Sequence, residues 1–178
     1  MPLRSPQGEL RVVSLGEAFE PAVQRSCSAL QTELGLTCSI LPFEPALDFA
    51  FDPNRGQYNG MLLLDWLEQR FAKVNVLALC DVDLFVPALT FVFGVARLDG
   101  PSAAISMTRL RETYFGRAED ELILLSRVEK EAVHEVGHML GLTHCMDRNC
   151  VMHASHNPAD TDVKSPRLCP SCHASLPW

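Results

Sequence analysis

The sequence predicts an α/β fold, because segments typical of β-strands alternate along the chain with segments typical of helices. Its 178 residues suit one compact fold with a full hydrophobic core. The apolar run at residues 74–80 is bounded by charged residues, which is typical of a strand buried on both faces, so we expect it at the centre of a sheet. An acidic stretch at residues 119–121 opens a long helix that is expected to reach about Leu140.

The N-terminal elements follow the same alternation. We expect a first strand at residues 10–15 and a helix at 17–34. Gly35 is expected to end that helix, because glycine readily takes the left-handed conformation of a helix end. The apolar run at 38–43 predicts a second strand, which Pro42 is expected to interrupt.

The middle of the chain adds further elements. Residues 51–60 are rich in turn formers and lead into an amphipathic helix at 61–71. Residues 89–97 are rich in β-forming residues and predict a strand exposed at a sheet edge. Gly94 inside this run is typical of a bulge or of close approach by another backbone. The run at 102–107 is expected to pair with this strand.

Composition and charge narrow the class of protein. About 47% of the residues are hydrophobic and 21% are charged, which argues against extensive disorder. The net charge of −7 argues against nucleic acid as a partner. No window approaches the roughly 20 apolar residues that cross a bilayer, and the first residues do not resemble a secretory signal. We therefore expect a soluble, cytoplasmic protein with no membrane partner, and a monomer.

Residues 134–144 read HEVGHMLGLTH and predict a metal centre. His134 and His138 are four residues apart, so on a helix both imidazoles can point at one ion. Glu135 lies one residue further round, where it can reach a metal-bound water as general base without being a ligand. His144 lies too far along for a continuing helix, and Gly141 supplies the sharp turn that returns it as third ligand. Three ligands leave a fourth zinc position for water.

A competing structural interpretation exists for this segment. It is a helix with two surface histidines, a glycine at its C-terminal end and an incidental His144. That interpretation does not explain why five specified positions coincide, so we favour the metal centre.

Four of the seven cysteines predict a second metal site, of the closed tetrahedral kind that supports structure. These are Cys145, Cys150, Cys169 and Cys172. A histidine at 153, 156 or 173 could replace one cysteine, and the four could instead form disulfides or a redox pair. The other cysteines, Cys27, Cys38 and Cys80, are interpreted as buried free thiols.

The character of the chain changes after Gly141. We predict an N-terminal sheet-and-helix subdomain at residues 1–141 and a C-terminal subdomain at 142–178. The C-terminal part shows little apolar periodicity, so we expect zinc rather than apolar burial to hold it together.

The pattern H-E-x-x-H-x-x-G-x-x-H is the metzincin signature. Residues 134–172, in which this motif runs straight into the four cysteines, resemble the archaemetzincins, and RGQYNG at 55–60 is similar to an upstream part of that family. The resemblance implies a twisted mixed sheet with an antiparallel edge strand above the active-site helix. It also implies that Met152 forms a turn beneath the three imidazoles.

The same resemblance implies two zinc ions per chain, one catalytic and one structural. The edge strand at 90–97 would bind an extended peptide across the zinc. Its substrate-binding residues would be Phe91, Val92, Phe93, Gly94 and Val95.

We therefore expect a zinc metallopeptidase acting on peptides or proteins, aminopeptidase-like or narrow in specificity. The alternatives are a non-catalytic, zinc-stapled peptide-binding protein and, on the cysteine tail alone, a zinc ribbon that binds nucleic acid. The acidic net charge argues against the zinc ribbon.

Overall fold

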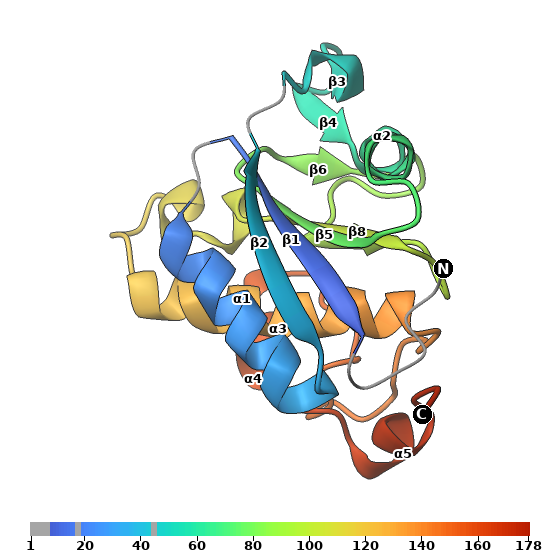
Figure 1. Ribbon diagram of the computed structural model, residues 1–178. Helices are drawn as coiled ribbons and strands as arrows, with labels where there is room; N and C mark the ends of the chain where they lie inside the picture. Colours follow the sequence, from blue (N-terminus) through green and yellow to red (C-terminus); the bar gives the residue numbers. More distant parts are fainter. Residues whose placement is uncertain (1–7, 17–18, 44–45) are drawn as a thin grey trace.

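The computed structural model describes residues 8–16, 19–43 and 46–178. This part of the chain forms a five-stranded main sheet of order β2-β1-β5-β8-β7 (Figure 1). The first four of these strands are parallel, and β7 is antiparallel to β8 at one edge. The strands are β1 (Glu9–Leu15), β2 (Thr37–Phe43), β5 (Asn75–Cys80), β8 (Ser102–Ser106) and β7 (Gly94–Ala96). The α/β class and the central place of β5 are confirmed.

Helices cover both faces of the main sheet. In Figure 1, α2 lies above it and α1 and α3 lie below it. Gly35 ends α1 at φ 68°, as predicted, and residues 17–18 of that predicted helix lie outside the described residues. The side chain of Asp120 accepts a hydrogen bond from the Ile123 backbone N–H at 3.0 Å and so caps α3. The helices are α1 (Glu20–Leu34), α2 (Gly60–Arg70), α3 (Glu121–Met139), α4 (Pro158–Val163) and α5 (Pro170–Ala174), with 3₁₀ turns at Asp48–Ala50, Thr108–Leu110 and Glu112–Phe115.

Two strand predictions need correction. Pro42 does not interrupt its strand, because β2 is the outermost strand and continues to Phe43 with Pro42 opposite Ser14. The strand predicted at 89–97 is regular only over Gly94–Ala96. Residues before it leave the main sheet, because Val92 forms an isolated bridge with Leu84 of another sheet.

That other sheet was not predicted. It has the order β3-β4-β6 and is made of β3 (Phe51–Asp52), β4 (Gln57–Asn59) and β6 (Leu84–Phe85). The turn-rich segment at 51–60 is thus a short hairpin that leads into α2. Strands of two or three residues carry no readable alternation, which is why the sequence pattern did not show them.

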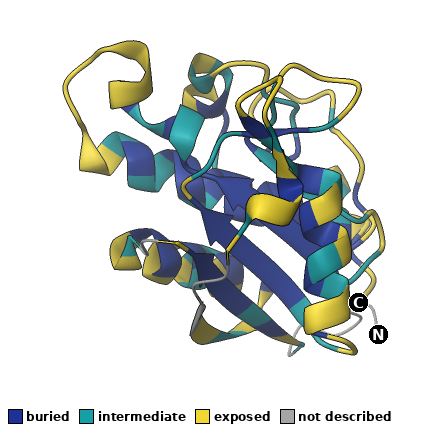
Figure 2. Cartoon of the chain, turned by 90° about the horizontal axis from the view of Figure 1, so that it is seen from above, coloured by how far each residue is buried: buried dark blue, intermediate teal, exposed yellow. Residues whose placement is uncertain are grey.

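The core lies on both faces of the main sheet, and Figure 2 shows its strands buried between the helices. Alternate residues of one strand face opposite sides. Leu77 and Leu79 of β5 belong to the cluster packed against α1 and α3, whereas Val76 and Ala78 belong to the cluster packed against α2. The sheet separates the two clusters, and α3 packs with its apolar side chains in the cluster shared with α1.

Apolar burial contributes more to holding the C-terminal tail, residues 142–178, than the sequence predicted. Its buried residues join the core cluster beneath the main sheet rather than forming a separate one. Single apolar residues in irregular turns do this without any periodicity, which is why the pattern missed them. These residues are Leu142, Cys150, Val151, Met152, Leu168 and Leu176.

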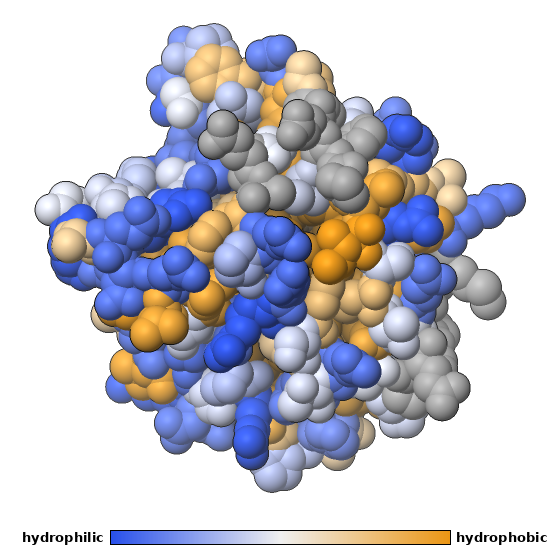
Figure 3. Space-filling model, turned by 60° about the vertical axis from the view of Figure 1, so that its left-hand side comes forward, coloured by the Kyte–Doolittle hydropathy of each residue, from blue (hydrophilic) through white to orange (hydrophobic). Residues whose placement is uncertain are grey.

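The outer surface is mainly hydrophilic on the face shown in Figure 3, with separate apolar patches between polar side chains. Ile40 and Leu41 on the outermost strand β2 contribute to the exposed apolar surface of the molecule, at 52% and 38% exposure. Among the described residues, no helix is both long and apolar enough to cross a membrane.

Candidate metal centre and cleft

The end of α3 places two imidazoles side by side. The Nε2 atoms of His134 and His138 lie 3.1 Å apart. Their Nδ1 atoms are 2.8 Å from the carbonyl oxygen of Val151 and 2.7 Å from that of Leu142. A carbonyl can only accept, so each Nδ1 carries the proton and each Nε2 presents a lone pair to the same point. This arrangement suits a metal ligand pair.

The turn after α3 brings the third imidazole to the same place. Gly141 has φ 89°, and its backbone N–H donates to the His138 carbonyl at 2.9 Å. The ring of His144 then lies 5.3 Å from that of His134 and 5.0 Å from that of His138, between centroids. The three histidines can offer donor atoms within 4.8 Å of one another.

The neutral state of the imidazoles favours metal binding at this cluster. Burial is the main cause that lowers the pKa of His134, His138 and His144 below the ordinary value. The imidazoles are therefore neutral at physiological pH, which is the form that binds zinc. His134 is buried while His144 is exposed, so the cluster opens to solvent on the His144 side.

Met152 supports the helix from behind. It is fully buried, and a Cβ built on Gly137 would lie 2.5 Å from its sulfur. The backbone N–H of Cys145 donates to the Met152 carbonyl at 2.9 Å, which joins the methionine turn to the residue after His144. Gly137 was not singled out from the sequence, because a glycine within a helix carries no signal of what it contacts.

Glu135 is buried beside the histidines and faces the edge of the main sheet. A Cβ built on Gly94 of β7 would lie 2.5 Å from its Cγ, so the carboxylate lies directly against the strand backbone. Burial is the main cause that raises the pKa of Glu135 well above its ordinary value, and the charge of Glu131 adds to it. The charge of Lys164 acts in the opposite direction.

A cleft of about 620 Å³ runs between the edge of the sheet and the histidines. One wall is formed by Val86, residues 89–96 and Leu98, and the other by α3 and the turns that follow it. All five predicted substrate-binding residues line it: Phe91, Val92, Phe93, Gly94 and Val95. Most of the lining side chains on the strand side are apolar.

The upper wall is fixed by the hairpin that contains the RGQYNG segment. The Arg55 guanidinium donates to the carbonyls of Leu89 and Thr90 at 3.0 and 2.9 Å. Gln57 Nε2 donates to the same Thr90 carbonyl at 3.0 Å and to Asp83 at 2.9 Å. These bonds satisfy backbone groups that a free loop would leave to solvent, so the wall is held in one position.

The four cysteines of the tail form a second cluster, with Sγ atoms within 4.8 Å of one another. All four are free thiols, and the Sγ atoms of Cys145 and Cys169 are 3.8 Å apart. Backbone N–H groups donate to these sulfurs, at 3.4 Å from Asp147 to Cys145 and 3.3 Å from Cys169 to Cys150. The pKa of Cys169 is lowered to about 7, first by a backbone hydrogen bond from Cys172. Such sulfurs are suited to tetrahedral zinc.

The remaining cysteines differ in burial. Cys80 is fully buried and its Sγ donates to the Ile105 carbonyl at 3.3 Å, as expected for a buried thiol, and burial raises its pKa to about 12. Cys27 and Cys38 are free but only half-buried, so the prediction that they are buried is wrong. They lie at the rim of α1 and β2, where the helix covers only part of the outermost strand.

A family model described as peptidase family M54 matches residues 59–177, which include both clusters. The chain belongs to peptidase family M54. Among its relatives, the archaemetzincin of Methanocaldococcus jannaschii is 41% identical over 139 residues, covering 78% of this chain and 76% of the relative. The predicted archaemetzincin resemblance and the class of zinc metalloprotease are confirmed.

Solved structures of M54 relatives share the fold. The crystal structure of archaemetzincin from Methanopyrus kandleri superposes with a TM-score of 0.84 at 35% identity, covering 97% of this chain and 94% of that chain. The archaemetzincin of Archaeoglobus fulgidus complexed with malonate gives a TM-score of 0.81 at 29% identity, covering 94% and 99%. The metzincin-like mixed sheet is confirmed.

Two site residues of this M54 chain were missed in the sequence. Glu131 lines the cleft one turn before Glu135, and Lys164 is buried beside it with Nζ 3.0 Å from Glu131 Oε1. A glutamate four residues before Glu135 on the same helix could have been noticed, since both lie on one face. Lys164 is separated from α3 by a long stretch of chain, so no local sequence pattern could predict its contact with Glu131.

Proposed function

We propose that this chain hydrolyses peptide bonds within extended peptides, with Glu135 as general base and zinc at His134, His138 and His144. The observation that carries the proposal is the position of the Glu135 carboxylate, which lies against the backbone of Gly94 on the edge strand and lines the same cleft as the three histidines. A substrate strand added to β7 would pass its backbone beside this carboxylate. The base would then lie at the bond to be broken.

The metal supports this chemistry when bound, since zinc activates water and polarises a carbonyl group. Glu135 takes a proton from the attacking water and passes it to the leaving amine. Its raised pKa suits both steps, because a group that both accepts and donates a proton works best near the operating pH. The neutral imidazoles hold their orientation through their Nδ1 hydrogen bonds.

We further propose that the four cysteines hold a second, structural zinc. Their Sγ atoms lie within 4.8 Å of one another, which supports a closed tetrahedral site, and Cys145 directly follows His144. Zinc there would fix the turn that carries His144. The peptide substrate, a monomeric state and location in the cytoplasm belong to the same proposal.

Charges in the cleft favour cleavage within a chain over removal of an N-terminal residue. Among the described residues that line it, the carboxylates are Glu131 and Glu135. Glu131 is paired with Lys164, and Glu135 is the proposed general base. Neither is left to bind the free ammonium group of a substrate N-terminus.

The test combines metal analysis with an unbiased peptide library analysed by mass spectrometry. We expect two zinc ions per chain and cleavage at internal bonds, with activity abolished in Glu135→Ala and Glu135→Gln while both metals stay bound. Activity retained in these variants would refute the role of Glu135. Tight binding of intact peptides without turnover would favour the non-catalytic alternative, and cleavage only at N-terminal residues would favour an aminopeptidase.

A further inference from the structure

Lys164 is the most completely buried charged side chain near the metal centre. Its side chain has no exposed surface, and Glu131 opposite it is only 4% exposed. The Lys164 Nζ lies 3.0 Å from Glu131 Oε1 and donates to the His153 carbonyl oxygen at 3.3 Å. Burying an ion pair costs about as much desolvation as the attraction returns, so stability alone does not explain its presence.

The pair touches two parts of the catalytic site. Glu131 lies one helical turn before Glu135 on α3 and lines the same cleft. His153 directly follows Met152, whose turn supports the histidine-bearing helix. Lys164 thus joins the helix to the methionine turn, and it neutralises the second carboxylate that faces the metal centre.

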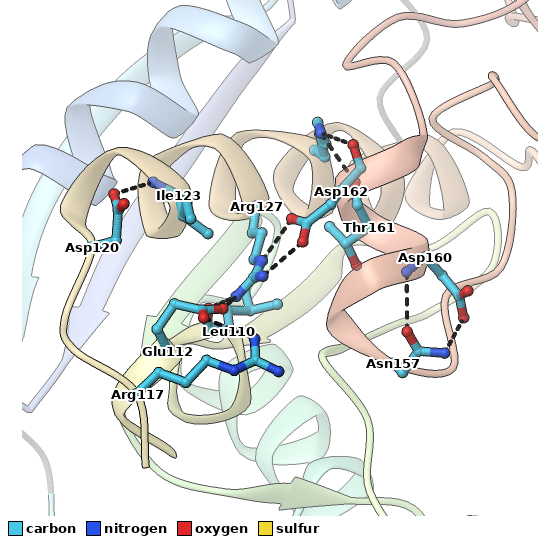
Figure 4. A network of polar contacts seen from close by, with 11 residues as sticks. Leu110, Glu112, Arg117, Asp120, Ile123, Arg127, Asn157, Asp160, Thr161 and Asp162 are labelled. Carbon is cyan, nitrogen blue, oxygen red and sulfur yellow. Dashed lines mark hydrogen bonds and ion pairs between the residues drawn. The ribbon is translucent and has the colours of Figure 1, made fainter. Parts of the chain in front are cut away.

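The tail does not need Lys164 in order to dock on α3. The Arg127 guanidinium donates to both carboxylate oxygens of Asp162 at 2.7 Å, as Figure 4 shows. Lys130 donates to the backbone carbonyls of Thr161 and Asp162 at 3.0 and 3.2 Å. Arg127 and Lys130, both on α3, therefore already anchor α4. Docking of α4 does not explain why Lys164 is paired with Glu131 at the cleft.

We propose that Lys164 is a positioning residue of the catalytic site, which holds Glu131 away from the three histidines so that one carboxylate, Glu135, acts on the substrate. This inference rests on the proposed function, since it concerns the same zinc. Without the ammonium, Glu131 would carry an unpaired charge in an apolar setting beside a cation site. Its carboxylate would then turn to the metal and compete for the position that water needs.

Four variants test this proposal. Lys164→Met removes the ammonium and keeps the length of the side chain, and Lys164→Arg keeps the charge. Glu131→Gln combined with Lys164→Met removes both charges, so it avoids the lone buried charge that could prevent folding. Lys130→Met is the matched control, because it removes a cation that docks the same α4 segment.

We expect Lys164→Met to lower kcat about 10- to 100-fold with little change in KM, the size of effect seen when groups surrounding a metal site are changed. The double variant and Lys164→Arg should recover most of this loss, and Lys130→Met should lower the melting temperature without changing kcat. If Lys164→Met and Lys130→Met behave alike, or if the double variant recovers nothing, Lys164 has only a structural role.

Zinc affinity gives a readout that does not depend on turnover. Titration with a competing chelator should show tighter binding of the more labile zinc in Lys164→Met, because Glu131 joins its ligands, and wild-type affinity in the double variant. Unchanged affinity in Lys164→Met would overturn the proposal even if the enzyme is active. Wild-type protein that binds a labile zinc but cleaves no peptide would instead refute the proposed function.

Discussion

Gly94 on β7 and Glu135 on α3 approach so closely that no side chain fits between them. A Cβ on Gly94 would lie 2.5 Å from the Glu135 Cγ and closer still to Oε1. The absence of a side chain at Gly94 therefore leaves room for the Glu135 carboxylate. The sequence predicted that another backbone would approach Gly94 closely, but the group that does so is a side chain. The edge of the sheet and the Glu135 carboxylate form one surface.

Gly94→Ala should abolish most activity, because the added methyl group must displace Glu135. Overpacking of this kind costs about 1–3 kcal/mol of folding free energy. Metal content should stay the same, since the atoms nearest to the added methyl group belong to Glu135 rather than to a histidine. Kinetics with metal analysis checks this, and the same substitution in a Glu135→Ala background should cost much less stability. An equal cost in both backgrounds would show that the clash is elsewhere.

Gly137→Ala should lower stability, although alanine within a helix is usually favoured over glycine by about 1 kcal/mol. The reversed sign follows from Met152, whose buried sulfur occupies the space that the methyl group needs. Thermal unfolding of the zinc-loaded protein measures the effect. A gain in melting temperature would mean that Met152 moves aside freely and does not support the helix.

Stability of the metal-free protein should depend on pH through Glu135. The pKa of this carboxyl is raised in the folded state. The stability that its protonated form contributes is therefore fully present below the ordinary pKa of 4.5, and it is lost as pH rises through the folded pKa. Glu135→Gln should therefore raise the melting temperature at pH 8, with the gain shrinking toward pH 4.5. Glu131, Lys164 and the three histidines face Glu135 in both proteins, and the charges of Glu131 and Lys164 act on its pKa in opposite directions. A gain independent of pH would contradict this origin.

Cys169→Ser should remove the structural zinc and lower both melting temperature and activity, although Cys169 lies outside the cleft. The expected link is Cys145, which shares the cluster with Cys169 and directly follows His144. Zinc content should fall from two to one per chain. Cys27→Ser is the control and should keep both metals, because Cys27 lies outside either cluster. Unchanged zinc content in Cys169→Ser would contradict the four-cysteine site.

The sequence by itself determined that the three histidines come together and that residues 74–80 form the central strand. Spacing within one helix determines the relative directions of its side chains. The positions of His134, Glu135 and His138 relative to one another could therefore be predicted without knowing the fold. Gly141 was readable for the same local reason, since a left-handed residue favours glycine. The long apolar run at 74–80 was readable because a strand covered on both faces has no polar side.

Only the tertiary structure decided what faces Glu135. Gly94, Glu131 and Lys164 come from three distant parts of the chain, and no local pattern encodes their approach. The short second sheet and the apolar packing of the tail were hidden for a related reason, since each relies on a few residues whose partners lie far away in the sequence. Local periodicity reports which face of an element is buried, whereas long-range packing decides what that face meets.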